Sequence, residues 1–195
     1  MKIICAITAG GKAQRMGGIT KAFITVDGER IIDKNINTLQ KYFSEIIIIS
    51  NQKDQFSEFT KFNIFSDIHQ NIGPIAGLHT ALTHCNSDAI FLVSSDMPFL
   101  SETIIQQLLL DFKTNKPQAL IPKIENQLEP LHGIYQKSIL SELEKYIEKQ
   151  ESYAMKDFLK TIQAKYFELE DTFDNRKSFC NINSIKDLDN STGFL

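Results

Sequence analysis

The stretch KIICAITAGGKAQRMGGITKAF, residues 2–23, decides the fold because it joins a buried strand to a glycine-rich turn. Its first part, residues 2–8, is a continuous apolar run, which is typical of a strand covered on both faces of a sheet. Gly10 and Gly11 follow almost directly, and such a turn can point backbone N–H groups at an anion. The stretch therefore predicts an α/β sheet with an anion site after its first strand.

Strand-like and helix-like segments alternate along the rest of the chain. Further strands are predicted at 45–50, 63–66, 89–94, 118–122, 131–135 and 165–169. Helices with one apolar face are predicted at 30–43, 74–85, from Ser101 to Phe112, at 137–149 and at 154–162. Such alternation indicates right-handed βαβ crossovers. We therefore expect an α/β protein with a single domain, residues 1–195, a three-layer Rossmann-like fold and a largely parallel sheet.

Composition limits the class of protein and its partners. Hydrophobic residues make up 42% of the chain, and no apolar run is long enough to span a bilayer, so no membrane partner is expected. The net charge of −3 argues against a nucleic-acid partner. The first residues lack the pattern of a signal peptide, which favours the cytoplasm. Cys5, Cys85 and Cys180 are interpreted as buried thiols, and the four histidines lack metal-ligand spacing.

The glycine-rich turn matches neither standard nucleotide loop. Two residues after Gly10 stands Lys12 and five residues after it stands Arg15, which excludes both the GxGxxG fingerprint and the GxxxxGK[ST] loop. The turn instead reads AGGxxxRMGxxxK, which is similar to the pyrophosphorylase signature of nucleotidyltransferases. Arg15 offers a planar fork and Lys21 a point charge to phosphate oxygens. The alternative is a turn with solvated basic side chains.

Polar residues also follow other predicted strands, where ligands bind in open α/β sheets. Asp96 follows the most hydrophobic strand and could hold Mg²⁺, or it could cap the next helix, although Ser101 is better placed for that task. Asn51 and Asp67 follow the second and third strands. They could bind a ribose or base, or serve only as turn residues.

Together these motifs resemble the molybdenum cofactor guanylyltransferase family. The matching segments are TAGGKAQRMGGITKAF, SNQ, DIHQNIGPIAGLHTAL, SSDMPFL, PLHGIY and FCNINSIKDL. The resemblance implies an enzyme with a nucleotidyltransferase fold that transfers GMP from GTP to the terminal phosphate of molybdopterin and releases pyrophosphate. It implies Mg²⁺ as cofactor, and molybdoenzymes or chaperones as candidate protein partners that receive the product.

The resemblance also assigns roles to residues. The nucleotide would be bound by Thr8, Ala9, Gly10, Gly11, Lys21, Asn51, Asp67 and Asp96. Catalysis would depend on Arg15, Lys21 and Asp96, with Asp96 as the Mg²⁺ ligand. The acceptor would lie against His132, Asn181 and Asn183, although a place in the core or at the rim of the site is at least an equal alternative for His132.

Two residues depart from the family pattern, and other functions compete. Thr8 stands where leucine is usual, and Thr20 stands where aspartate usually precedes the lysine. Within the same chemistry, the rivals use CTP with molybdopterin or a nucleoside triphosphate with a sugar phosphate. A non-catalytic nucleotide-binding module is a rival of another class. An oxidoreductase is disfavoured because the dinucleotide fingerprint is missing.

Overall fold

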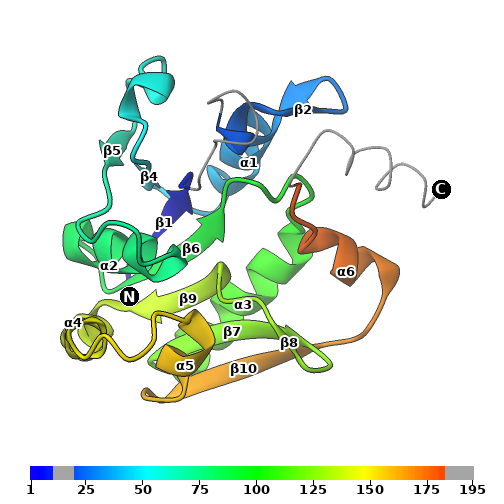
Figure 1. The fold of residues 1–195 in the computed structure, drawn as a ribbon. Helices are drawn as coiled ribbons and strands as arrows, with labels where there is room; N and C mark the ends of the chain where they lie inside the picture. Colours follow the sequence, from blue (N-terminus) through cyan, green and yellow to red (C-terminus); the bar gives the residue numbers. More distant parts are fainter. Residues whose placement is uncertain (11–19, 183–195) are drawn as a thin grey trace.

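An eight-stranded sheet forms the centre of the protein, for which a computed structural model describes residues 1–10 and 20–182 (Figure 1). Its strands are β1 (Ile3–Thr8), β4 (Ile46–Ile49), β5 (Asn63–Phe65), β6 (Ala89–Ser94), β7 (Ala119–Ile124), β8 (Gln127–Leu128), β9 (His132–Gln136) and β10 (Ala164–Leu169). Their order is β10-β7-β9-β6-β1-β4-β5, and β8 pairs with β7. The first strand thus lies inside the sheet, between β6 and β4.

The sheet is largely parallel, as the alternation predicts. Strands β6, β1, β4 and β5 run in one direction, with Thr8 paired to Ser94 on one side and to Ile49 on the other. Strand β9 is antiparallel to both of its neighbours, and β10 is parallel to β7. The carboxyl ends of β1, β4, β5 and β6 therefore meet at one edge.

Helices cover both faces of this sheet, which gives the expected three layers. Ile3, Cys5 and Ile7 belong to one apolar cluster, whereas Ile4 and Ala6 belong to another on the opposite face. The first cluster includes α1 (Ile31–Leu39) and α3 (Glu102–Asn115). The second includes α2 (Pro74–His84), α4 (Leu140–Glu148) and α5 (Met155–Leu159). Burial of β1 on both faces explains why its sequence is apolar throughout.

Several short elements were not predicted because they are too short to show a period. They are β8, the ribbon of β2 (Thr25–Val26) and β3 (Glu29–Arg30), the 3₁₀ turns η2 (Lys21–Phe23), η3 (Lys53–Phe56) and η4 (Lys137–Ile139), and α6 (Phe173–Ser178). The helix predicted at 30–43 ends at Leu39. The expectation of three buried thiols is wrong for Cys180, which is partly exposed, and right for Cys5 and Cys85.

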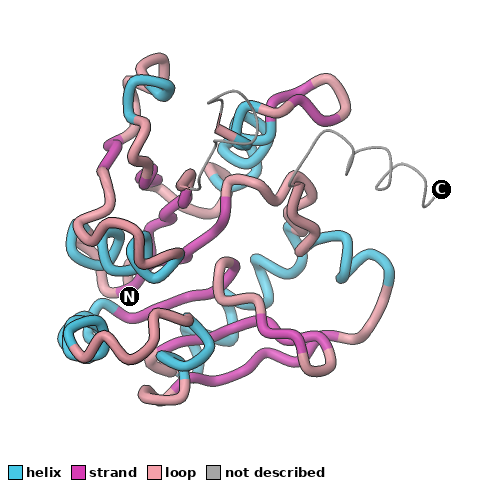
Figure 2. Tube along the Cα trace, in the orientation of Figure 1, coloured by secondary structure: helices cyan, strands magenta, loops and turns pink. Residues whose placement is uncertain are grey.

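Loops follow the carboxyl ends of the parallel strands, as the tube in Figure 2 shows for β4 and β6. These loops bring together the polar residues that follow the strands. Within residues 1–10 and 20–182, no helix is both long enough and apolar enough to cross a membrane.

Candidate functional site

A cavity of about 430 Å³ opens at the carboxyl edge of the sheet. It is lined by Thr8 at the end of β1, by Ala9 and Gly10 after it, by Asn51 after β4, by Asp67 after β5, by Ser94 at the end of β6 and by the first turn of α2. Its volume lies within the range of small-molecule sites. Of the eight residues predicted to bind nucleotide, five line this cavity.

Asn51 and Asp67 form a reciprocal pair across one side of the cavity. The Asn51 side-chain amide donates to Asp67 Oδ2 at 2.8 Å, and the Asp67 backbone N–H donates to Asn51 Oδ1 at 2.9 Å. Gln70 donates to the Asp67 carbonyl at 2.9 Å. Burial raises the pKa of the Asp67 carboxyl, and the bond from Asn51 opposes part of this shift. The two residues therefore act as one built polar wall rather than as separate turn residues.

Thr8 and α2, which also line the cavity, approach each other closely. The Thr8 hydroxyl donates to the Val93 carbonyl at 3.2 Å, which fixes the side chain. A Cβ atom on Gly77 of α2 would lie 2.8 Å from Thr8 Cγ2, nearer than Cβ atoms normally come. Gly77 thus lets the first turn of α2 pack against the end of β1. Pro74 begins this helix, where its missing N–H costs nothing.

Lys21 and Asp96 form an ion pair beside the cavity. Lys21 Nζ lies 3.5 Å from Asp96 Oδ2, and Asp96 Oδ1 accepts a hydrogen bond from Ser94 Oγ at 2.6 Å. Because Ser94 also lines the cavity, this bond connects the ion pair to the cavity lining. The alternative of Asp96 as a helix cap is not supported, because Ser101 Oγ accepts from the Ile104 N–H at 3.3 Å and caps α3.

The segment after α6 reaches the same edge of the sheet. The Ile182 N–H donates to the Asp96 carbonyl at 2.9 Å, and Ile182 is fully buried. Asn181, the residue before it, is exposed. The predicted acceptor residue Asn181 is therefore held next to the predicted metal ligand in space, although 85 positions separate Asp96 from Asn181 in the chain.

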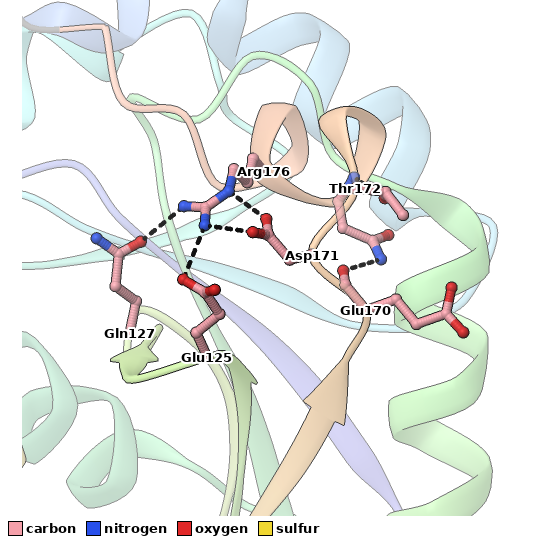
Figure 3. Close-up of polar contacts among 7 residues, drawn as sticks. Glu125, Gln127, Glu170, Asp171, Thr172 and Arg176 are labelled. Carbon is pink, nitrogen blue, oxygen red and sulfur yellow. Dashed lines mark hydrogen bonds and ion pairs between the residues drawn. The ribbon is translucent and has the colours of Figure 1, made fainter.

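Arg176 lies in α6, just before this segment, and Figure 3 shows its polar contacts. From α6 its guanidinium donates to Asp171, to Glu125 Oε2 at 3.1 Å and to Gln127 Oε1 at 3.5 Å. Glu125 and Gln127 belong to the hairpin of β7 and β8. The hairpin and α6 are thus tied together by a planar, multiply bonded cation.

His132 lies in the core and not at the acceptor side. Its ring is fully buried and edge-on to Phe91 and Phe179, with centroids 5.0 and 5.1 Å away. Neither ring nitrogen has a hydrogen-bond partner in the part of the chain that the structure describes. Burial lowers the pKa of His132 to about 3. The prediction of direct contact with an acceptor is therefore corrected in favour of the core alternative.

Gly11, Arg15 and Asn183 lie outside the described residues. Sequence reasoning missed Gln52, Gln70 and Ser94 as parts of the site. For Ser94 a signal existed, because residues two apart at the end of a strand lie on one side and Ser94 stands two before Asp96. No comparable pattern marked the glutamines.

This arrangement defines a class of protein. A cavity beyond the carboxyl ends of parallel strands, with Gly10 in its lining and the Lys21–Asp96 pair beside it, is typical of proteins that bind nucleotide phosphates. The fold and the site therefore define a nucleotide-binding α/β protein.

Comparison with known proteins specifies the family. Residues 5–166 match the family model described as MobA-like NTP transferase domain. A protein of Clostridium perfringens strain SM101 named "Probable molybdenum cofactor guanylyltransferase" is 39% identical over 145 residues, 74% of this chain and 71% of that protein. One of the same name from Natranaerobius thermophilus is 28% identical and covers 99% of this chain and 96% of its own.

A solved structure agrees with these sequence matches. The molybdopterin-guanine dinucleotide biosynthesis protein A of Archaeoglobus fulgidus superposes with a TM-score of 0.79 at 25% identity, covering 100% of this chain and 98% of that one. The chain belongs to the MobA-like NTP transferase family and is a nucleotidyltransferase of the molybdenum cofactor guanylyltransferase type.

Proposed function

We propose that this enzyme transfers GMP from GTP to the terminal phosphate of molybdopterin and releases pyrophosphate. The observation that carries the proposal is the pairing of a nucleoside-sized cavity with the Lys21–Asp96 pair at its edge. The names of the relatives support the acceptor and the base. Molybdoenzymes or chaperones that accept the product are proposed as protein partners on the same grounds.

The chemistry of the Asn51–Asp67 wall supports guanine as the base. A carboxylate accepts hydrogen bonds, and guanine presents two adjacent donor groups, N1–H and the N2 amine, on one edge. Cytosine and adenine each place a ring acceptor beside their amine, and a carboxylate repels that acceptor. Asp67 is therefore the proposed reader of the base, and Asn51 holds its carboxylate in place through Oδ2.

Asp96 is the proposed ligand of Mg²⁺, and its surroundings fit the ion. One carboxylate with phosphate oxygens and waters is the donor set that Mg²⁺ prefers in nucleotide sites. The described residues accordingly contain no cluster of three or more histidine, cysteine or acidic ligands. When bound, the ion would offset charge on the triphosphate. Ser94 Oγ, at the end of β6, donates to Asp96 Oδ1 and so orients the carboxylate. The other carboxylate oxygen, Asp96 Oδ2, faces Lys21.

The reaction requires two anions to meet, and the chain addresses their repulsion. An oxygen of the acceptor phosphate attacks the α-phosphorus, and the bond from that phosphorus to pyrophosphate breaks in line. Lys21 neutralises phosphate charge, and Arg15 is proposed to do the same. A phosphate nucleophile is already ionised at pH 7, so the mechanism needs no general base, and a buried neutral His132 is consistent with it.

The test is a transfer assay with the purified chain, Mg²⁺, molybdopterin and each of GTP, CTP, ATP and UTP. Release of pyrophosphate with GTP, together with a guanylated pterin, is the expected result. Product with CTP, or transfer to a sugar phosphate, would replace the proposed substrates. Nucleotide binding without pyrophosphate release would identify a non-catalytic module.

Two variants test the roles of the ion pair. Lys21→Met and Asp96→Asn should each reduce turnover by roughly a hundredfold, because one strong electrostatic contact commonly contributes about 3 kcal/mol to the transition state. Lys123→Met is the matched control, since it removes a lysine from a surface pair with Glu168, and neither residue lines the cavity. Unchanged transfer by both site variants would refute the assignment.

A further inference from the structure

Thr20 is buried and is held by two glutamines from another part of the chain. Its backbone N–H donates to Gln55 Oε1 at 3.0 Å. Its hydroxyl lies 2.7 Å from Gln55 Oε1 and 2.8 Å from Gln52 Oε1, so its single proton is shared between two acceptors. Only 7% of the Thr20 surface is exposed. A residue at the end of the glycine-rich turn is thus fixed on both its backbone and its side chain.

The hydroxyl of Thr20 does not perform the task that its position suggests. Thr20 precedes η2, where a threonine normally turns its oxygen back to cap the helix, yet its side chain makes no capping bond. Apolar packing joins the same two turns, because Phe23 of η2 lies 4.9 Å from Phe56 of η3 between ring centroids. Turns η2 and η3 therefore form one packed unit.

The segment that supplies the glutamines also holds the other end of the glycine-rich turn. Ser50 Oγ donates to the Ala9 carbonyl at 3.3 Å and accepts from the Gln52 N–H at 3.2 Å. Asn51, between Ser50 and Gln52, bonds to Asp67 in the nucleoside wall. One short segment thus connects the nucleoside cavity to both ends of the turn and, through Thr20, to the adjacent Lys21.

We propose that Thr20, Gln52 and Gln55 position Lys21 relative to the nucleoside cavity. Lys21 can then contact the phosphates of a nucleotide whose base occupies the cavity. We call these three positioning residues the Thr20 clamp. The inference rests on the proposed function in that Lys21 binds phosphate. None of the three residues needs to touch the phosphates, since their effect reaches the ligand through the backbone of Lys21.

The clamp also explains how the chain uses a threonine where its family usually has aspartate. A carboxylate at position 20 would face the Gln55 amide oxygen, which now accepts from both the backbone N–H and the hydroxyl of Thr20. Gln55 cannot turn its amide to present N–H groups without losing the bond from the Thr20 backbone N–H. Thr20→Asp is therefore expected to weaken triphosphate binding here, although it restores the usual family residue.

The experiment compares triphosphate and monophosphate binding by calorimetry with Mg²⁺ present. Thr20→Val and Gln55→Leu should each weaken GTP binding about tenfold, the loss expected for one buried bond whose partner stays unsatisfied. GMP binding should change less than twofold, and Thr20→Ser should recover GTP binding. The double variant should bind GTP more weakly than either single variant but by less than the sum of the two losses, because the bond from the Thr20 hydroxyl to Gln55 is lost in both.

Gln118→Leu is the matched control. Its amide oxygen also accepts a backbone N–H, from Gln163 at 2.7 Å, at the far edge of the sheet. Thermal unfolding of every variant checks folding, and Thr20→Ala replaces Thr20→Val if the latter does not fold. Equal losses for GMP and GTP, unchanged GTP binding, or additive losses in the double variant would overturn the clamp.

The same measurements separate the clamp from the proposed function. If the unmodified chain prefers CTP, ATP or UTP, the triphosphate and monophosphate of that base replace GTP and GMP. A selective triphosphate loss there keeps the clamp and rejects the guanine assignment. GTP binding with no selective loss keeps the proposed function and rejects the clamp. Failure of the unmodified chain to bind any nucleoside triphosphate rejects both.

Discussion

Replacement of Gly77 by alanine should destabilise the protein and disturb its nucleoside cavity. A Cβ atom at position 77 would lie 2.8 Å from Thr8 Cγ2. Thr8 cannot simply rotate away, because rotation about its Cα–Cβ bond would also remove its hydroxyl from the Val93 carbonyl. Relief therefore requires a shift of α2 away from β1, and both elements line the cavity.

The magnitude follows from two opposing terms. Overpacking a well-filled site costs about 1–3 kcal/mol. Alanine in place of glycine inside a helix gains up to about 1 kcal/mol. The net expected loss in the free energy of unfolding is therefore about 1 kcal/mol, within a range of about 0–2 kcal/mol. In a Thr8→Ser background the Cγ2 methyl is absent and the hydroxyl is kept, so Gly77→Ala should become neutral or slightly stabilising.

The assay is urea unfolding of the four proteins in this cycle, with GTP binding measured in parallel. The change in effect of Gly77→Ala between the two backgrounds is the quantity that tests the contact. If Gly77→Ala is equally destabilising with threonine and with serine at position 8, the clash with Thr8 Cγ2 is not the cause. Stabilisation in both backgrounds would refute the reasoning altogether.

Three further predictions concern charge and the acceptor side. Asp67→Asn should weaken GTP binding. It should nevertheless raise the melting temperature at pH 7, because burial disfavours the ionised carboxyl of Asp67. This gain in melting temperature should shrink as the pH falls through the raised pKa of Asp67. Burial lowers the pKa of His132 from 6.5 to about 3, so on acidification the unfolded chain binds the proton before the folded chain does. Lowering the pH from 8 to 5 should therefore reduce the free energy of unfolding by about 2 kcal/mol through this residue. His132→Phe should remove this part of the loss in unfolding experiments. Arg176→Met should speed hydrogen exchange at the Ile182 amide while leaving β1 amides unchanged; equal protection in both proteins would show that α6 needs no such tie.

The layers of the fold were predictable because long buried strands have a distinctive composition. Residues 46–49 are four isoleucines, and they form β4 with both faces covered. The reversal of β9 was not predictable in the same way, because an apolar strand buried between two neighbours has the same composition in either direction. The short ribbon and α6 depend on tertiary contacts such as those of Arg176, which leave no period in the sequence.

For the site, position after a strand was a better guide than residue type. Asn51, Asp67 and Asp96 each follow a strand, and each lies at the expected edge. His132 failed as a prediction because it lies within β9, where its ring enters the core between Phe91 and Phe179. Histidine is a frequent catalytic residue, which favoured a functional interpretation of His132. Because its ring is buried without a polar partner among the described residues, it is neutral and serves in packing.

Thr8 and Thr20, the two residues that depart from the family pattern, are each explained by their contacts with neighbouring residues. The methyl group of Thr8 occupies the space that Gly77 leaves, and its hydroxyl bonds to Val93. Thr20 satisfies Gln55, which would repel the usual aspartate. Each departure is therefore one member of a set of contacts, and a single change toward the family residue breaks that set. Leucine at position 8 would place a longer side chain against Gly77 and would lose the hydrogen bond to Val93, so Thr8→Leu alone is expected to destabilise this chain.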